Sequence, residues 1–122
     1  VMHFHGDADT IVPYTGKHEN GRREWFCSVS ETIDCWCKID GCGEEPTSEP
    51  VADRVEDGTS VEKIVYAAGS SGAEVVLFRI VGGGHTWPGM KSPLKMLGKS
   101  TLDISANDLM WEFFEKHPLG KE

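Results

Sequence analysis

Two stretches of the 122-residue sequence carry side chains suited to acid–base chemistry. The first, GGGHTWPG at residues 82–89, places His85 on a loop directly after the most strand-like run of the chain, 74–81. Its glycines let the backbone turn sharply, and Pro88 and Gly89 stop the segment from continuing as a helix or strand. An active-site histidine is typically presented in this way. By itself, however, the loop is equally consistent with a catalytic histidine and with a histidine that lies in a turn by chance.

The second stretch is HGDADTIVPY at residues 5–14, where Asp9 stands just past an expected strand at 1–5. In open α/β sheets, ligands and catalytic groups gather at the carboxyl ends of strands. Two strand ends therefore offer a carboxylate, Asp9, and later an imidazole, His85. These are the last two members of a triad in the order Ser, Asp, His. A Gly-x-Ser-x-Gly motif for the first member does not occur in the sequence.

These two motifs, with DISAND at 103–108 and WEFF at 111–114, resemble the C-terminal part of a family of secreted esterases. The family includes polyhydroxybutyrate depolymerase-like and feruloyl or acetyl xylan esterase-like enzymes. The resemblance covers both ends and the histidine loop, and is weak between 16 and 58. It implies that Asp9 and His85 are the acid and base of a catalytic triad whose serine lies upstream.

The resemblance also implies the fold class, which is α/β. Residues 1–122 would form the C-terminal part of a single α/β-hydrolase domain, made of its last sheet strands, a hairpin and two packing helices. The N-terminal portion with the nucleophile elbow would be absent, so the sequence is expected to be a fragment. The opening of the chain inside an expected strand agrees with this.

The implied function is that of a carboxylic ester hydrolase that needs no cofactor or metal. The expected substrate is a small ester, a polyester or an esterified polysaccharide, and the expected location is secreted or periplasmic. The isolated chain is expected to be inactive because it lacks the serine. Trp87 either walls the substrate pocket or packs in the core. The net charge of −8 argues against nucleic acid or an anionic membrane as a partner.

Two alternatives to the esterase remain. One is a noncatalytic small α+β binding module whose GGGHTWPG loop contacts a partner. The other is a metal-dependent hydrolase that uses an H-x-H-x-D-x-D stretch, since imidazole and carboxylate are common metal ligands. This stretch comprises His3, His5, Asp7 and Asp9. It is disfavoured because no further cluster of ligands follows, and His5 is expected instead to order the turn that leads to Asp9.

The strands and helices that would position these residues are predicted from hydrophobic periodicity and from capping residues. Strands at 60–67 and 74–81 are expected to form a hairpin around GSSG at 69–72, with the second strand buried on both faces. Polar loops are expected at 15–23, 43–58 and 90–101. Two helices are expected after the caps Ser28 and Ser105. Their apolar stripes comprise Val29, Ile33, Trp36 and Cys37 in the first helix, and Ala106, Leu109, Met110, Phe113 and Phe114 in the second.

The four cysteines, Cys27, Cys35, Cys37 and Cys42, cluster in and around the first helix. Cys35 and Cys37 lie two residues apart, so they point to nearly opposite sides of a helix and do not pair with each other. The spacing does not match the paired C-x-x-C pattern of zinc sites. A disulfide that involves Cys42 is therefore expected, with its partner open, and buried free thiols are the alternative.

Overall fold

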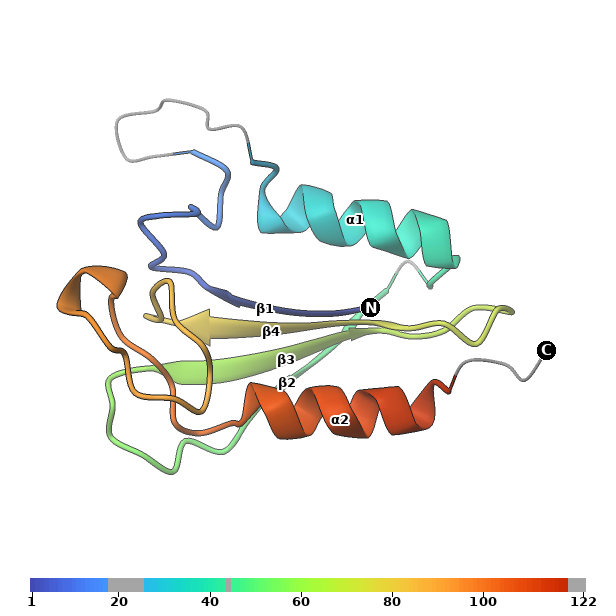
Figure 1. Ribbon diagram of the computed structural model, residues 1–122. Coiled ribbons are helices and arrows are strands. Elements are labelled where there is room, and N and C mark those ends of the chain that lie inside the picture. Colours follow the sequence, from blue (N-terminus) through green and yellow to red (C-terminus); the bar gives the residue numbers. More distant parts are fainter. Residues whose placement is uncertain (18–25, 44, 119–122) are drawn as a thin grey trace.

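The computed structural model describes residues 1–17, 26–43 and 45–118 (Figure 1). Within these residues, one sheet has the strand order β1-β4-β3-β2. Strand β1 runs parallel to β4, whereas β3 is antiparallel to both β4 and β2. The strands are β1 (Met2–Gly6), β2 (Thr47–Pro50), β3 (Ser60–Tyr66) and β4 (Val75–Val81). Residues 18–23 of the loop expected at 15–23 lie outside the described residues.

One helix covers each face of the sheet, so the described part of the chain has three layers (Figure 1). Helix α1 (Val29–Asp40) packs on one face and α2 (Ala106–Lys116) on the other. A short 3-10 helix, η1 (Lys95–Leu97), lies in the connection between β4 and α2. None of the described helices is long and apolar enough to cross a membrane.

Strand β4 is the centre of both cores, as its continuous apolar sequence predicted. Alternate side chains of a strand point to opposite faces of the sheet. Val75 and Leu77 accordingly join Val29 and Ile33 of α1 in one buried cluster. Residues 76, 78 and 80 join Val61 in the second buried cluster, against which side chains of α2 pack. Each large side chain that is fully buried contributes on the order of 1.5–3 kcal/mol.

The predicted helix caps are confirmed. The Ser28 hydroxyl accepts a hydrogen bond from the Glu31 amide at 3.1 Å, and the Glu31 carboxylate accepts one from the Ser28 amide at 2.8 Å. Gly41 ends α1 with a φ of 65°, a left-handed conformation that suits glycine. At the start of α2, the Ser105 hydroxyl accepts from the Asp108 amide at 3.3 Å.

The apolar stripes of the helices are narrower than predicted. Val29, Ile33 and Ala106 are buried, but Trp36 and Phe114 are exposed. A helix that packs on one face of a small sheet buries only the side chains directed at that sheet. Residues at the flanks of the 3.6-residue pattern therefore stay in solvent.

The predicted fold class is wrong. An α/β-hydrolase portion would extend a largely parallel sheet, whereas the described residues form a small mixed sheet with one parallel pair and two antiparallel pairs. Strands β1 and β4 form the parallel pair, but β3 and β2 continue the sheet in the antiparallel sense. Two short motifs specify local turns and do not determine the order of the strands.

Strand β2 was missed, because the sequence predicted an exposed acidic loop at 43–58. All four residues of β2 are indeed exposed, but their backbone pairs with β3. Glu49 receives a hydrogen bond from Lys63 of β3 at 3.2 Å. An edge strand of this kind is held by main-chain pairing and needs no apolar pattern, so its sequence resembles that of a loop. In the expected loop at 90–101, η1 was missed as well.

The predicted disulfide is absent, because all four cysteines are free thiols. The left-handed cap at Gly41 returns the chain so that the amide of Cys42 donates to the carbonyl of Cys37 at 2.9 Å. Both of these side chains pack against the core cluster beneath α1. Burial raises the pKa of Cys37 to about 11, and the hydrogen-bonded thiol of Cys42 acts in the same direction.

Alkylation rates test the thiol environment. At pH 8.5, a thiol of pKa about 11 has a thiolate fraction roughly 100-fold below that of an ordinary thiol. Iodoacetamide should therefore label the exposed Cys35 much faster than Cys37, as followed by tandem mass spectrometry of the digested protein. Unfolding in urea should remove the difference. Equal rates in the folded protein would contradict the burial of Cys37.

Asp57 connects the segment before β3 to the segment before α2. Its Oδ1 accepts hydrogen bonds from the amide and hydroxyl of Thr59 at 2.9 and 2.6 Å, and its Oδ2 accepts one from the Leu102 amide at 2.7 Å. Burial by itself raises the pKa of Asp57, but these hydrogen bonds outweigh it and hold the pKa below its ordinary value. The carboxylate is therefore the favoured form in the folded chain.

A lowered pKa in the folded state stabilises the fold at pH values above the unfolded-state pKa, which is about 4. This contribution is lost as the pH falls through the lower folded-state value. We expect Asp57→Asn to reduce the free energy of unfolding by about 1 kcal/mol at pH 7 and to weaken its acid dependence. Urea titrations at pH 7 and below pH 4 measure both effects. Asp53→Asn, at an exposed position nearby, is the control, and an unchanged pH dependence in Asp57→Asn would contradict the assignment.

Candidate acid–base site

The two loops that carry the predicted site residues meet at one end of the sheet. Because β1 and β4 are parallel and paired up to Gly6 and Ile80, their carboxyl ends lie side by side (Figure 1). The loop after β1 carries Asp9, and the loop after β4 carries His85. The Nδ1 atom of His85 lies 2.9 Å from Oδ2 of Asp9. The structure thus brings together two residues that are 76 positions apart.

This meeting requires glycine at the crossing point of the loops. A Cβ atom on Gly6 would collide with the backbone of Gly83 and Gly84. A Cβ atom on Gly84 would likewise collide with the Leu97 carbonyl and lie 2.8 Å from the Cα of Gly98. The glycines at these positions are therefore required for close backbone approach.

Asp7 links the loop after β1 to strand β4 and to the start of the loop that follows β4. Its Oδ1 accepts a hydrogen bond from the Gly82 amide at 2.7 Å, and its Oδ2 pairs with the guanidinium of Arg79 at 2.9 Å. The hydrogen bond to Asp7 raises the pKa of Arg79, which keeps the guanidinium charged. Arg79 was not identified from the sequence as a partner of Asp7. The available signal was a single charged residue in the otherwise apolar strand β4.

Asp9 is held rigidly. Only 4% of its side chain is exposed. Its Oδ1 accepts hydrogen bonds from the amides of Ile11 and Val12, both at 2.8 Å. Such an Asx-type turn fixes the plane of the carboxylate. Because Oδ1 is occupied by two donors, Oδ2 is the oxygen that faces His85.

His85 is oriented on one side and open on the other. A carboxylate only accepts hydrogen bonds, so Nδ1 of His85 donates its proton to Asp9. The Nε2 atom of the neutral ring is then unprotonated, and it has no partner among the described residues. The side chain is 48% exposed. An exposed, unprotonated Nε2 next to a buried carboxylate is suited to accept a proton from a hydroxyl group.

Two hydroxyls in the connection between β4 and α2 are bonded to backbone carbonyls. Thr86 donates to the carbonyl of Lys99 at 3.0 Å, and Ser100 donates to the carbonyl of Trp87 at 3.2 Å. Within the described residues, the recorded hydrogen bond of the His85 ring is the one to Asp9. The described chain therefore presents a base and its orienting acid without a hydroxyl hydrogen-bonded to the base.

Trp87 lies on the surface of the protein. Its side chain is held by a hydrogen bond from Nε1 to Oδ1 of Asn107 at 3.1 Å, and the residue is 47% exposed. The core-packing alternative for Trp87 is therefore wrong. The loop that carries His85 thus also carries a fixed and half-exposed indole, two residues further along the chain.

The residues of the H-x-H-x-D-x-D stretch have other partners. His3 and His5 bond each other at 3.3 Å, and His5 also bonds the carbonyl of Val12 at 2.8 Å. Asp7 pairs with Arg79, and Asp9 bonds His85. In residues 1–17, 26–43 and 45–118, no group of three or more His, Cys, Asp or Glu side chains is placed to hold a metal ion.

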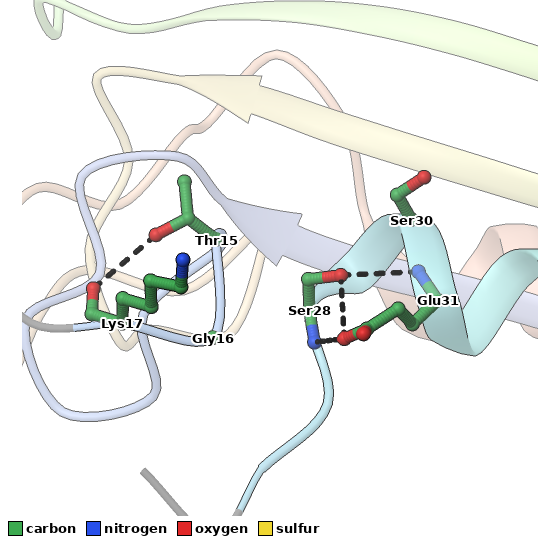
Figure 2. A pocket seen from close by; sticks show the side chains of 6 residues that line it. All are labelled: Thr15, Gly16, Lys17, Ser28, Ser30 and Glu31. Carbon is green, nitrogen blue, oxygen red and sulfur yellow. Dashed lines mark hydrogen bonds between the residues drawn. The ribbon is translucent and has the colours of Figure 1, made fainter. Parts of the chain in front are cut away.

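A separate polar pocket of about 300 Å³ lies at the start of α1 (Figure 2). Figure 2 shows the reciprocal hydrogen bonds of Ser28 and Glu31 at one side of it. The acid–base residues do not line this pocket, so it belongs to the helix cap. Its lining residues are Thr15, Gly16, Lys17, Ser28, Ser30 and Glu31.

Comparison with known proteins gives one informative similarity. The chain is 29% identical over 124 residues to the protein named "Putative esterase NocK" of Nocardia uniformis subsp. tsuyamanensis. The alignment covers 93% of this chain, but the chain spans only 36% of the length of that relative. No protein-family model matches the sequence, and no solved structure matches it. The similarity supports a relationship to an esterase.

The crossing of the loops leads to a test of the site geometry. We expect Gly6→Ala to lower the free energy of unfolding by about 1–3 kcal/mol, because the added methyl group meets backbone that cannot easily move. It should also separate Asp9 from His85. Urea denaturation measures the first effect, and the imidazole ¹⁵N shifts of His85 measure the second.

Gly43→Ala is the matched control. The nearest atom to a Cβ on Gly43 is the carbonyl oxygen of Ala67 at 3.9 Å, an ordinary contact distance. This variant should stay within about 0.5 kcal/mol of the parent chain. Equal behaviour of the two variants would show that the loops do not depend on close approach at Gly6.

Proposed function

We propose that this chain supplies the acid and base of a serine-type carboxylic ester hydrolase. The observation that carries the proposal is the hydrogen bond of 2.9 Å between His85 and Asp9, with Nε2 of His85 left open. The similarity to a protein named as an esterase supports it. The proposal concerns a larger protein, in which residues 1–122 form the C-terminal portion and the nucleophilic serine lies outside this sequence.

The proposed reaction uses His85 twice. Nε2 of His85 takes the proton of the serine hydroxyl while the serine oxygen attacks the ester carbonyl. The resulting imidazolium then gives this proton to the leaving alcohol, and an acyl-enzyme is formed. A water molecule repeats the sequence: His85 accepts its proton, the acyl bond is hydrolysed, and the serine is regenerated.

Asp9 acts on this reaction through His85. Its Oδ2 accepts from Nδ1, which selects the tautomer with an unprotonated Nε2 and stabilises the imidazolium once it forms. The two hydrogen bonds that backbone amides donate to Oδ1 prevent the carboxylate from rotating. The acid is therefore oriented before the substrate binds, so no reorganisation is needed during proton transfer.

Trp87 is proposed to contact the substrate. Its hydrogen bond to Asn107 fixes the half-exposed indole, which lies two residues along the loop from His85. In the proposal, this indole presents an apolar face to an acyl or alcohol group. A small ester, a polyester and an esterified polysaccharide all fit this description. A secreted or periplasmic location is consistent with such substrates and belongs to the same proposal.

The proposal is tested on the longer protein that is encoded together with the sequence upstream of residue 1. The assay measures turnover of p-nitrophenyl acetate. We expect His85→Ala to lower kcat/KM by about 10³-fold or more, and Asp9→Asn to lower it strongly as well, because each removes part of the proton-transfer machinery. The folded state of both variants should be intact by circular dichroism. Lys91→Ala, at an exposed position in the same connection, should retain activity.

Two results would contradict the proposal. Near-parental activity of His85→Ala in the extended protein would exclude His85 as the base. An upstream coding region without a Gly-x-Ser-x-Gly motif would remove the serine and favour the binding-module alternative. For the 122-residue chain alone, we expect neither turnover nor labelling by a fluorophosphonate, because no serine is hydrogen-bonded to His85 in its described part.

A further inference from the structure

We propose that His5 is a positioning residue of the acid–base site, which holds the Asp9 turn in place through the carbonyl of Val12. The catalytic consequence rests on the proposed function, whereas the positioning itself concerns the geometry of this chain. His5 is the next-to-last residue of β1, and 12% of its side chain is exposed. It lies beneath the turn that presents Asp9.

Both polar backbone groups of Val12 are used to close this turn. The amide of Val12 donates to Oδ1 of Asp9 at 2.8 Å. The carbonyl of Val12 bonds Nε2 of His5 at 2.8 Å. The turn is therefore fixed from within by Asp9 and from the strand by His5.

Hydrogen-bond chemistry determines the tautomer of His5. A carbonyl only accepts, so Nε2 of His5 carries a proton. Nδ1 of the neutral ring is then unprotonated and accepts from Nε2 of His3 at 3.3 Å. Burial, together with the neighbouring His5, lowers the pKa of His3, which favours the neutral donor required here.

Packing fixes the ring of His5 in the same orientation. The ring of His3 lies nearly parallel to it, with ring centroids 5.5 Å apart and an interplanar angle of 13°. Tyr14 meets it edge-on, with centroids 5.7 Å apart and an angle of 84°. Since Tyr14 follows Val12 in the same loop, these contacts also hold the loop against β1.

His5 also faces the carboxylate directly. Its Nε2 lies 3.7 Å from Oδ2 of Asp9, the oxygen that accepts from His85. This distance is too long for a hydrogen bond, but it places the partial positive charge of the N–H group near the oxygen that orients the base. Loss of the imidazole should release the Val12 carbonyl and let Oδ2 move away from Nδ1 of His85.

The test uses ¹⁵N shifts of the imidazoles in the 122-residue chain, detected through the carbon-bound ring protons. These shifts report the tautomer of each histidine without any ester turnover. In the parent chain we expect His85 in the Nδ1–H form. In His5→Phe, which keeps a ring but has no donor, we expect His85 to shift toward the Nε2–H form that free histidine favours.

A rescue variant and a control make the test specific. His5→Gln places an amide N–H near the position of Nε2 and should preserve the tautomer of His85. His117→Phe removes a histidine that bonds Glu74 at 3.0 Å, away from the Asp9 turn, and should leave His85 unchanged. If His5→Phe does not fold, His5→Asn replaces it, because its shorter amide does not reach the Val12 carbonyl.

The outcome separates this inference from the proposed function. The positioning role would be overturned by an unchanged His85 tautomer in a folded variant without a donor. It would also be overturned if His5→Gln shifted the His85 tautomer as much as His5→Phe does. Neither result depends on esterase activity. In the extended protein, His5→Phe should lower kcat by about 10–100-fold with little change in KM. A purely structural role would instead lower the amount of folded enzyme, while the kcat of the folded fraction stayed constant.

Discussion

The close approach of two backbones at Gly6 and Gly83 is the constraint on which the candidate site depends. It occurs because β1 and β4 are parallel and end at the same edge of the sheet. Only residues without a Cβ allow the following loops to cross there. The amide of Ala8 then donates to the carbonyl of Gly83 at 2.9 Å, so the crossing is also a hydrogen-bonded contact. A carboxylate from one loop thereby reaches an imidazole from the other.

Polar contacts convert this crossing into a defined geometry. The ion pair of Asp7 and Arg79 joins the loop after β1 to strand β4, and the bonds of Asp9 and His5 to Val12 hold the Asp9 turn. Within the described residues, no buried side-chain polar atom lacks a hydrogen-bond partner. Since an unpaired buried group is costly, a fully paired network favours one arrangement over its alternatives. Nε2 of the half-exposed His85 lies outside this network, and it is the atom that the proposed reaction uses.

The esterase relationship and the small mixed sheet are compatible. The relationship rests on a similarity that spans 36% of the relative's length, and the proposed chemistry rests on two side chains and the loops that carry them. Such a pair can be built at the end of any parallel strand pair, because function resides in the site and not in the remainder of the fold. The position of a nucleophile would depend on the parts of the larger protein that surround this sheet.

The sequence by itself determined the local elements: the capped helices, the hairpin, the buried strand β4 and the glycine-rich loops around Asp9 and His85. Each of these depends on residues close together in the chain, through periodicity, caps and turn chemistry. Strand β2, the antiparallel extension of the sheet, the free cysteines and the ion pair of Arg79 were decided only by the tertiary structure. They depend on main-chain pairing and on contacts between distant segments. Asp9 and His85 could be named from their motifs, but only the parallel pairing of β1 and β4 placed them 2.9 Å apart.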